Sequence, residues 1–218
     1  MSEIIKGRNV RTELAATFGE PKTITGISKT SPGVATCVGH AIPAGTVGYL
    51  RSLDGMVQLE NQAVRVASVT ADTFVLQGIN TTNFSDFSGT CEFVPAATWV
   101  TLAEATSYAI GGGAAEKLDT TTLIDVIKQE ENGLLAAQTL ALNVLAKTTP
   151  SAAMLQAEAA AQSGGKLLVR ITLNDGALRI AYGEPDLPGE DVQKGAVGTG
   201  AMTISAKGFI PKLPASFA

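Results

Sequence analysis

The sequence contains few of the residues from which most metal and catalytic sites are built. Among 218 residues there is one histidine, His40, and there are two cysteines, Cys37 and Cys91. A single histidine excludes a multi-histidine metal site, and no cysteine-pair motif takes its place. Two cysteines are too few for a disulfide framework. We expect them to be small buried hydrophobic residues in a reducing compartment, with a disulfide between them as the open alternative.

Aromatic and charged residues are also scarce. Aromatic residues make up 5% of the chain, so platforms that stack nucleic acid bases or sugar rings are poorly supplied. Charged residues make up 17%, whereas about 25% is usual for soluble domains. This composition favours a protein that buries much of its outer surface against copies of itself. An unusually uncharged monomer is the alternative.

The charge that is present is slightly acidic and has no clusters of one sign. The chain has 16 basic and 20 acidic residues, a net charge of −4, and no run of Lys or Arg. Tight binding to nucleic acid phosphates is therefore not expected. No segment approaches the roughly 18 continuous apolar residues that span a bilayer, and the first residues contain no apolar signal segment. We expect no membrane partner, and folding in a cytoplasm.

Short β-type runs dominate residues 26–93. The runs are GVATCVG, TVGYLRSL, QAVRVASV, TFVLQGI and GTCEFV, separated by turn residues. Within SVTADTFVL the polar TADT lies between two apolar runs, which predicts a hairpin. The regular spacing predicts a compact small barrel or meander.

This segment resembles a small β-barrel module related to the first catalytic-cysteine half-domain of ubiquitin-activating enzymes, copies of which are inserted in phage structural proteins. The resemblance is carried by LDGMVQLENQAVRVASVTADTFVLQGINTTNF. The matching positions are Gly55, Met56, Asn61, Gln62, Val66, Val69, Asp72, Thr73, Phe74, Leu76, Gly78, Ile79 and Phe84. Asn80 stands where an aspartate is more usual. The resemblance implies the fold of residues 26–93 and no activity.

The chain after Pro95 continues with the strand-like TWVTLAEATSYAI and a flexible Gly111–Gly113 connection. The stretch TTTLIDVIKQEENGLL, residues 120–135, is compatible with a short amphipathic helix or with a strand. Its threonines and β-branched residues favour the strand. Asn132-Gly133 then predicts a turn into the apolar run QTLALNVLA, which follows as the next strand.

One helix and one hairpin are the clearest local predictions. SAAMLQAEAAAQSGG predicts a helix with Ser151 as its N-cap and Gly164-Gly165 as its end. KLLVRITL and ALRIAYG flank Asn174-Asp175-Gly176, the strongest hairpin signal in the chain. GEPDLPGEDVQKG contains two prolines and four acids and predicts an extended arm or loop over residues 184–195, followed by a strand in GAMTISAKGFI. Its acids form either a solvated face or a contact with a neighbouring subunit.

An enzyme would have to be built from scattered acids. Glu116, Asp119 and Asp125 are three and six residues apart, whereas residues of a strand share a face only at spacings of two. A serine or cysteine nucleophile would depend on His40 as its base, and no nucleophile-elbow motif is present. No cofactor is expected. The sequence therefore favours a structural protein. A catalytic activity that is lost in the His40→Ala variant would support the enzyme hypothesis instead.

The chain outside residues 26–93 resembles the tail tube proteins of long-tailed, non-contractile bacteriophages. The resemblance is carried by TWVTLAEATSYAIGGGAAEKLDTTTLIDVIKQEENGLL and continues through the helix, the NDG hairpin and the closing TISAKGFIPKL strand. It implies a mainly β fold with one packed helix, a tube sandwich or barrel whose sheets join across subunits, plus the inserted small β-barrel. The expected domains are a discontinuous tail tube domain, 1–25 and 94–218, and the inserted module, 26–93.

The resemblance further implies a structural subunit and not an enzyme. Such subunits form hexameric rings that stack into a hollow conduit around a tape-measure protein, dock to tail terminator and tail tip proteins, and let DNA pass without tight binding. The location is the virion tail, after assembly in the host cytoplasm. The predicted inter-subunit residues, at the start of a tube strand, are Leu118, Asp119, Thr120, Thr121, Thr122 and Leu123. The hairpin and arm candidates are Asn174, Asp175, Gly176, Pro185 and Pro188.

Two further functions stay open from the sequence. One is the tube protein of a contractile or type VI secretion-like system, which would need an outer surface matched to a sheath. The other is a virion decoration module that binds host glycan, which the low aromatic content disfavours.

Overall fold

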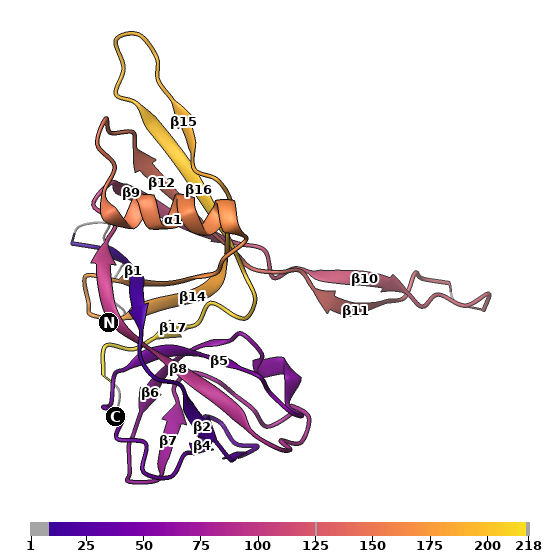
Figure 1. Cartoon of the computed structure of the whole chain (residues 1–218). Coiled ribbons are helices and arrows are strands. Elements are labelled where there is room, and N and C mark those ends of the chain that lie inside the picture. Colours follow the sequence, from indigo (N-terminus) through magenta and orange to yellow (C-terminus); the bar gives the residue numbers. More distant parts are fainter. Residues whose placement is uncertain (1–8, 125, 217–218) are drawn as a thin grey trace.

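The computed structural model describes residues 9–124 and 126–216. It is mainly β, with a single α-helix among these residues, as the sequence predicts (Figure 1). Two bodies lie one above the other, and two hairpins project from the upper one. We call the lower body the small barrel and the strands that curl behind the helix α1 (Ala152–Ser163) the main sheet.

The strands of the small barrel form a closed ring. Their bounds are β2 (Lys22–Ile24), β3 (Gly26–Ile27), β4 (Gly33–Thr36), β5 (Val47–Arg51), β6 (Ala63–Ala67) and β7 (Thr73–Leu76). The pairing order is β3-β4-β7-β6-β5-β8, where β8 is Cys91–Thr101, and β2 pairs with β8. Because only Thr25 separates β2 from β3, these two short strands close the ring between β8 and β4. The predicted hairpin is confirmed in the β6–β7 ladder.

The small barrel encloses its own core, in which Phe74, Phe93 and Leu50 are fully buried. Cys37 and Cys91 lie in the same core as free thiols, which confirms the prediction that they are buried hydrophobic residues. The short 3-10 turn Val57–Leu59 contributes Leu59 to this core.

The main sheet continues from the small barrel without a break. Its strands are β1 (Arg11–Phe18), β8 (Cys91–Thr101), β9 (Ala105–Gly111), β12 (Thr139–Leu145), β13 (Leu167–Thr172), β14 (Leu178–Pro185) and β16 (Thr199–Ala206), with the short β17 (Lys212–Leu213) beside β14. The order is β8-β1-β13-β14-β16-β12-β9. Strand β8 pairs with β5 and β2 in its first half and with β1 in its second. It therefore runs across the predicted domain boundary at residue 93, and the division into two domains stays a prediction.

Successive side chains along a strand of the main sheet point to opposite faces and enter two different apolar clusters. In β13 Leu167, Val169 and Ile171 enter the core beneath α1, whereas Leu168 points to the other face and joins the cluster against the small barrel. Both faces of the central strands are thus apolar, as in a sheet covered on two sides.

The helix α1 (Ala152–Ser163) follows the predicted signals at both ends. The Ser151 hydroxyl accepts a hydrogen bond from the Met154 N–H, and Gly164 adopts a left-handed conformation, φ 67°, as C-cap. The buried face consists of Ala153, Met154 and Ala157, which pack over the main sheet. Small side chains let the helix lie close to β1, where Gln156 Nε2 donates to the Ala15 carbonyl at 2.6 Å.

A buried carboxylate ties the start of α1 to the turn between β8 and β9. Glu104 is buried and accepts hydrogen bonds from the Ser151 N–H at 2.9 Å and the Ser151 hydroxyl at 2.7 Å. Lys147 Nζ lies 3.7 Å from the same carboxylate. Burial alone would raise the pKa of Glu104, but the hydrogen bonds from Ser151 together with the Lys147 charge outweigh it and lower the pKa below its ordinary value.

This arrangement predicts how stability changes with pH. Because the folded pKa of Glu104 is depressed, its contribution is fully present above the ordinary value of 4.5 and is lost as pH falls through the lower folded pKa. We expect the Glu104→Gln variant to lose less unfolding free energy than the wild type when the pH is lowered from neutral through the folded pKa of Glu104. Ser151→Ala is expected to cost about 1 kcal/mol at neutral pH through loss of the cap. Urea denaturation at several pH values measures both, and an unchanged acid slope in Glu104→Gln would refute the assignment.

Candidate functional site

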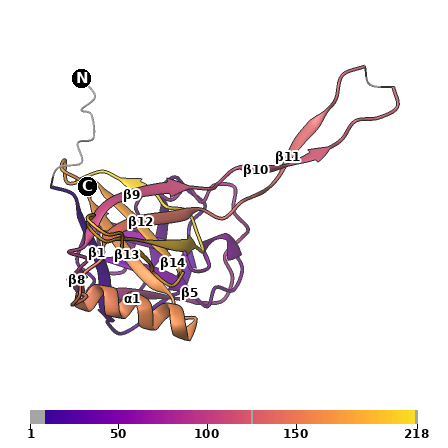
Figure 2. The same cartoon turned by 90° about the horizontal axis from the view of Figure 1, so that it is seen from above.

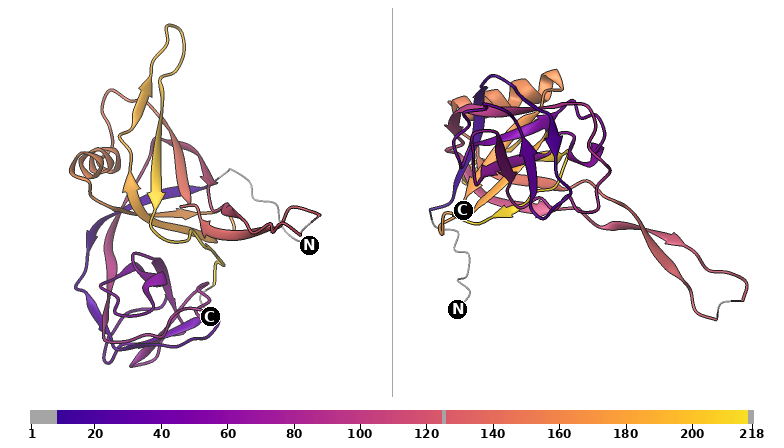
Figure 3. Two further views of the ribbon diagram at one scale, coloured as in Figure 1. Left: turned by 90° about the vertical axis from the view of Figure 1, so that its right-hand side faces the viewer. Right: turned by 90° about the horizontal axis from the view of Figure 1, so that it is seen from below.

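A long hairpin, the β10–β11 arm, projects from the body of the molecule (Figure 1). It consists of β10 (Ala115–Asp119) and β11 (Glu130–Leu135), which form a two-stranded sheet separate from the main sheet. The arm leaves the body on the side opposite α1 (Figures 2 and 3). Gly112 and Gly113 lie at its root with φ near 77° and 78°, where glycine is the residue that adopts this conformation without strain.

Polar contacts within the arm include a hydrogen bond that joins its two strands. Lys117 Nζ donates to Asn132 Oδ1 at 2.6 Å, and Lys128 Nζ lies 2.6 Å from the Glu130 carboxylate. The Asp119 carboxylate accepts from the Thr121 N–H at 2.9 Å, and this hydrogen bonding lowers the pKa of Asp119. An isolated two-stranded hairpin is at best marginally stable in water, so a partner that covers the arm would stabilise it.

The end of the arm carries uncovered apolar side chains. Ile124 is 90% exposed and Leu123 is fully exposed. Val126 and Ile127 in the same loop are also largely exposed. A cluster of aliphatic side chains at the end of a projecting hairpin is typical of a protein contact surface.

Two sequence predictions for this segment are wrong. Residues 120–129 form the loop at the end of the arm and not a strand, although residue 125 lies outside the described residues. Asn132-Gly133 is not a turn, because Asn132 pairs with Lys117 inside β11. The ladder shifts register between Ala115 and Lys117, and Gly133 lies in this irregularity, where a residue without a side chain is favoured.

A second hairpin extends β16 at the far end from the small barrel (Figure 1). It pairs β15 (Gly189–Asp191) with Thr199–Ala201. The predicted extended arm over residues 184–195 is therefore partly strand: Glu184 and Pro185 end β14 opposite Ser205 and Ile204. Proline is tolerated there because it is the last residue of its strand. Pro188 directly precedes β15.

The predicted Asn174–Gly176 hairpin is confirmed in its geometry. The Leu173 N–H donates to the Ala177 carbonyl, the Asp175 carboxylate accepts from the Ala177 N–H, and Gly176 has φ 79°. This turn lies beside Ala215 of the C-terminal segment. The structure does not bring it together with Leu118–Leu123, which lie in the β10–β11 arm.

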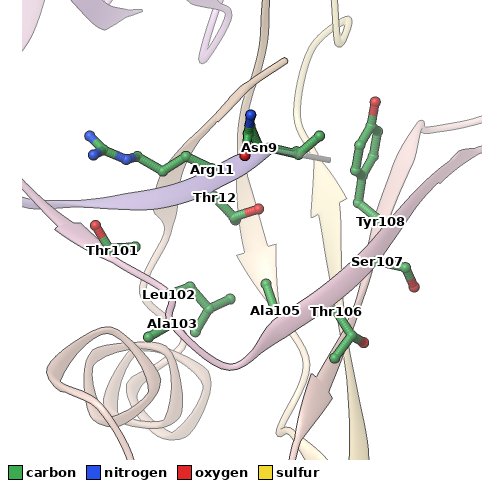
Figure 4. Close-up of a pocket in the computed structure, with 11 residues that line it drawn as sticks. Asn9, Arg11, Thr12, Thr101, Leu102, Ala103, Ala105, Thr106, Ser107 and Tyr108 are labelled. Carbon is green, nitrogen blue, oxygen red and sulfur yellow. The ribbon is translucent and has the colours of Figure 1, made fainter. Parts of the chain in front are cut away.

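The main sheet is open along a groove between its two ends. Strand β9 is the last strand in the pairing order, so its outer edge is unpaired in the described residues. The groove, of about 660 Å³, lies between the start of β1 and the first half of β9. Thr12, Leu102 and Ala105 face this space, and Tyr108 stands at its side (Figure 4). An unpaired edge of this kind is a template for a strand of another chain.

The exposed face of β9, β12 and β16 is a regular grid of small uncharged residues. Cross-strand pairing places the members of each row side by side. They are Ser107, Asn143 and Ala201 in the first row, Ala109, Ala141 and Thr203 in the second, and Gly111, Thr139 and Ser205 in the third. This face was not predicted from the sequence, although apolar residues alternate with small or polar ones in TLALNVL. Opposite it, Leu140, Leu142 and Ile204 enter the core.

The candidate reactive groups lie in unreactive settings. Burial raises the pKa of Cys91 to about 12 and also raises that of Cys37, which disfavours the nucleophilic thiolate. His40 is buried against Phe74 and accepts a hydrogen bond from the Ile42 N–H. The described residues contain no group of three or more His, Cys, Asp or Glu side chains that could hold a metal. Among the same residues, no helix has the length and apolarity to cross a membrane.

Comparison with known proteins gives one family. No curated protein sequence matches the chain significantly. The family model described as "Phage tail tube protein, TTP" matches residues 54–208, more than two thirds of the chain, and the match begins inside the small barrel. This family is structural, and its members form the tube of the virion tail. The chain therefore belongs to the phage tail tube protein family.

Proposed function

We propose that the chain assembles into hexameric rings that stack into the hollow tail tube of a long-tailed, non-contractile phage. The tube forms around a tape-measure protein in the host cytoplasm, and its ends dock to tail terminator and tail tip proteins. The observation that carries this proposal is the family match together with a main sheet that is left open at β9. Closure of such sheets across subunits satisfies edge backbone groups and removes the risk of uncontrolled edge pairing.

The β10–β11 arm supplies the contact between successive subunits. Its apolar end projects away from the body, and no described residue of its own chain covers it (Figure 2). The predicted inter-subunit residues Leu118–Leu123 all belong to this arm, at the end of β10 and in the loop that follows. The Asn174–Gly176 turn and the β15–β16 hairpin, with Pro185 and Pro188 at its base, are further contact candidates.

The uncharged grid on β9, β12 and β16 forms the wall of the conduit. DNA binding by proteins depends on Lys and Arg that replace counterions at the phosphates, and the grid has none. Its side chains are small, so the wall is smooth. The chain's net charge of −4 adds a weak repulsion. DNA then passes without being held.

Residues 26–93 are an inserted module that decorates the tube. The closed pairing of the small barrel and its separate core support this proposal, as does the resemblance to the barrel module of ubiquitin-activating enzymes. A bulky barrel on the outside would obstruct a sheath, which favours a non-contractile tail over a contractile one. The Cys37 and Cys91 thiols are buried in its core, so neither is placed to act as a nucleophile.

Negative-stain electron microscopy across a concentration series, with mass by light scattering on the same samples, tests the proposal. We expect hollow tubes of uniform width and a ring species of six times the 22.4 kDa chain mass. Tubes that retard duplex DNA strongly at about 150 mM salt would contradict the conduit wall. A stable monomer that binds sugars saturably would favour a decoration protein instead.

A further inference from the structure

The C-terminal segment, residues 207–216, crosses from the main sheet to the small barrel. After β16 ends at Ala206, the chain forms β17 beside Leu178 and Arg179 of β14. It then passes along β6 and β7 of the small barrel, where Gly78 lies against Leu213. The segment therefore contacts both bodies at once.

Two buried polar side chains of the small barrel hold the end of this segment. Arg65 in β6 is 2% exposed, and its Nε donates to Gln77 Oε1 at 2.5 Å. Its Nη2 donates to the Pro214 carbonyl and, at 3.2 Å, to the Ser216 carbonyl. Gln77 Nε2 donates to the same Ser216 carbonyl at 2.9 Å. Burial lowers the pKa of Arg65, and such a buried cation is tolerated only when its donors are occupied.

A third side chain holds the start of the segment. The Gln62 amide is buried and pairs twice with Phe209: its Nε2 donates to the Phe209 carbonyl at 2.9 Å, and its Oε1 accepts from the Phe209 N–H at 2.8 Å. Gly208 lies directly against Gln62, so closely that a Cβ would collide with the amide. The Gln62 amide thus forms a pair of hydrogen bonds with the Phe209 main chain, as a residue of a neighbouring strand would.

Apolar contacts complete the junction. Tyr49 of the small barrel stacks on Tyr182 of β14, with ring centroids 4.0 Å apart and planes within 10°. Leu213 of the segment is fully buried in the same cluster, beside Ala63 and Ile180. The segment is therefore packed between the small barrel and the main sheet.

We propose that Gln62, Arg65 and Gln77 form a peptide-binding site on the small barrel, and that the chain's own C-terminal segment fills it as a latch. Only two chain connections join the small barrel to the main sheet, through Gly19-Glu20-Pro21 and along β8. The latch adds a third link across the junction, so the barrel keeps one fixed orientation on the tube wall. Sequence separations of 139 to 151 residues divide the paired groups, which makes the latch a property of the folded chain.

Hydrogen exchange of full-length variants tests the latch. In Arg65→Met we expect the exchange protection of residues 207–216 to fall by at least about tenfold, with tryptic cleavage after Lys212 accelerated similarly. The core amides of the small barrel, such as Phe74, should keep their protection. Arg51→Met is the matched control, because Arg51 lies in the same barrel but pairs at the surface with Glu92 at 2.7 Å and does not contact the segment.

A second variant keeps the proposal testable if Arg65→Met does not fold. Gln77→Glu keeps an acceptor for Arg65 Nε but replaces the amide that donates to the Ser216 carbonyl with a second acceptor, so it should release residues 214–216 as well. If either folded variant keeps wild-type protection across 207–216, the latch is refuted. Loss of protection confined to 207–216, absent in Arg51→Met, supports it whether or not the chain forms tubes.

Discussion

Replacing Leu123 and Ile124 together with aspartate is expected to abolish tube formation while the subunit stays folded. Both side chains are almost completely exposed at the end of the β10–β11 arm, so their replacement leaves the core of the subunit untouched. If the arm supplies the contact between subunits, as proposed above, both side chains become buried at every such contact in a tube. Burial of an aliphatic side chain contributes about 1.5–3 kcal/mol, so losing two weakens each contact by roughly 100-fold or more.

Sedimentation and electron microscopy at matched concentrations measure this effect. Val38→Asp is the control, because Val38 is also exposed but lies on the small barrel, away from the arm. Circular dichroism and urea denaturation verify that each variant is folded. Tubes of normal length from the double aspartate variant would exclude the arm from the subunit contact.

Local physical chemistry was enough to predict the elements whose signals are self-contained. The helix follows from Ser151, an Ala-rich interior and Gly164, and each of these acts within one or two turns. The Asn174–Gly176 hairpin follows from a turn that needs a positive φ at Gly176. The burial of both cysteines and the strands of the small barrel follow from short apolar runs between turn residues.

The same signals failed where two conformations have similar local energies. Thr120–Leu123 and Ile127 have high strand propensity, yet this stretch forms the loop of the arm. The direction change is set by the register that pairs Asp119 with Glu130, and register is decided by long-range packing that a single sequence does not display. Asn132-Gly133 is a favourable turn sequence, but both residues lie in β11, where the pairing with β10 shifts register.

The candidate surfaces were predictable only in part. The sequence indicated the arm region and an uncharged protein, but not which strand faces share the small side chains. That grid exists because β9, β12 and β16 are neighbours, although β16 begins more than fifty residues after β12 ends. The Gln62, Arg65 and Gln77 site could not be foreseen at all. Its partners are backbone carbonyls and one backbone N–H of a distant segment, which have no sequence signature.

Gly183→Ala is expected to destabilise the main sheet by roughly 3 kcal/mol or more, although it adds one methyl group. Gly183 lies in β14 where this strand pairs with β16, and an added Cβ would collide with the Ser205 carbonyl and lie 2.8 Å from Ala206 Cα. These obstacles are backbone atoms, so no side chain can move aside. The strands must separate.

Gly189→Ala is the matched control for that substitution. Gly189 also pairs with β16, but its added Cβ would lie 3.9 Å from the nearest atom, the Ala201 carbonyl oxygen, so the change should stay within about 0.5 kcal/mol. Hydrogen exchange on Gly183→Ala also tests the predicted domains. If residues 26–93 are a module with its own core, β4 to β7 keep their protection while β12 to β16 lose theirs. Simultaneous loss in both bodies would mean that the Tyr49–Tyr182 junction and the latch make the chain one cooperative unit.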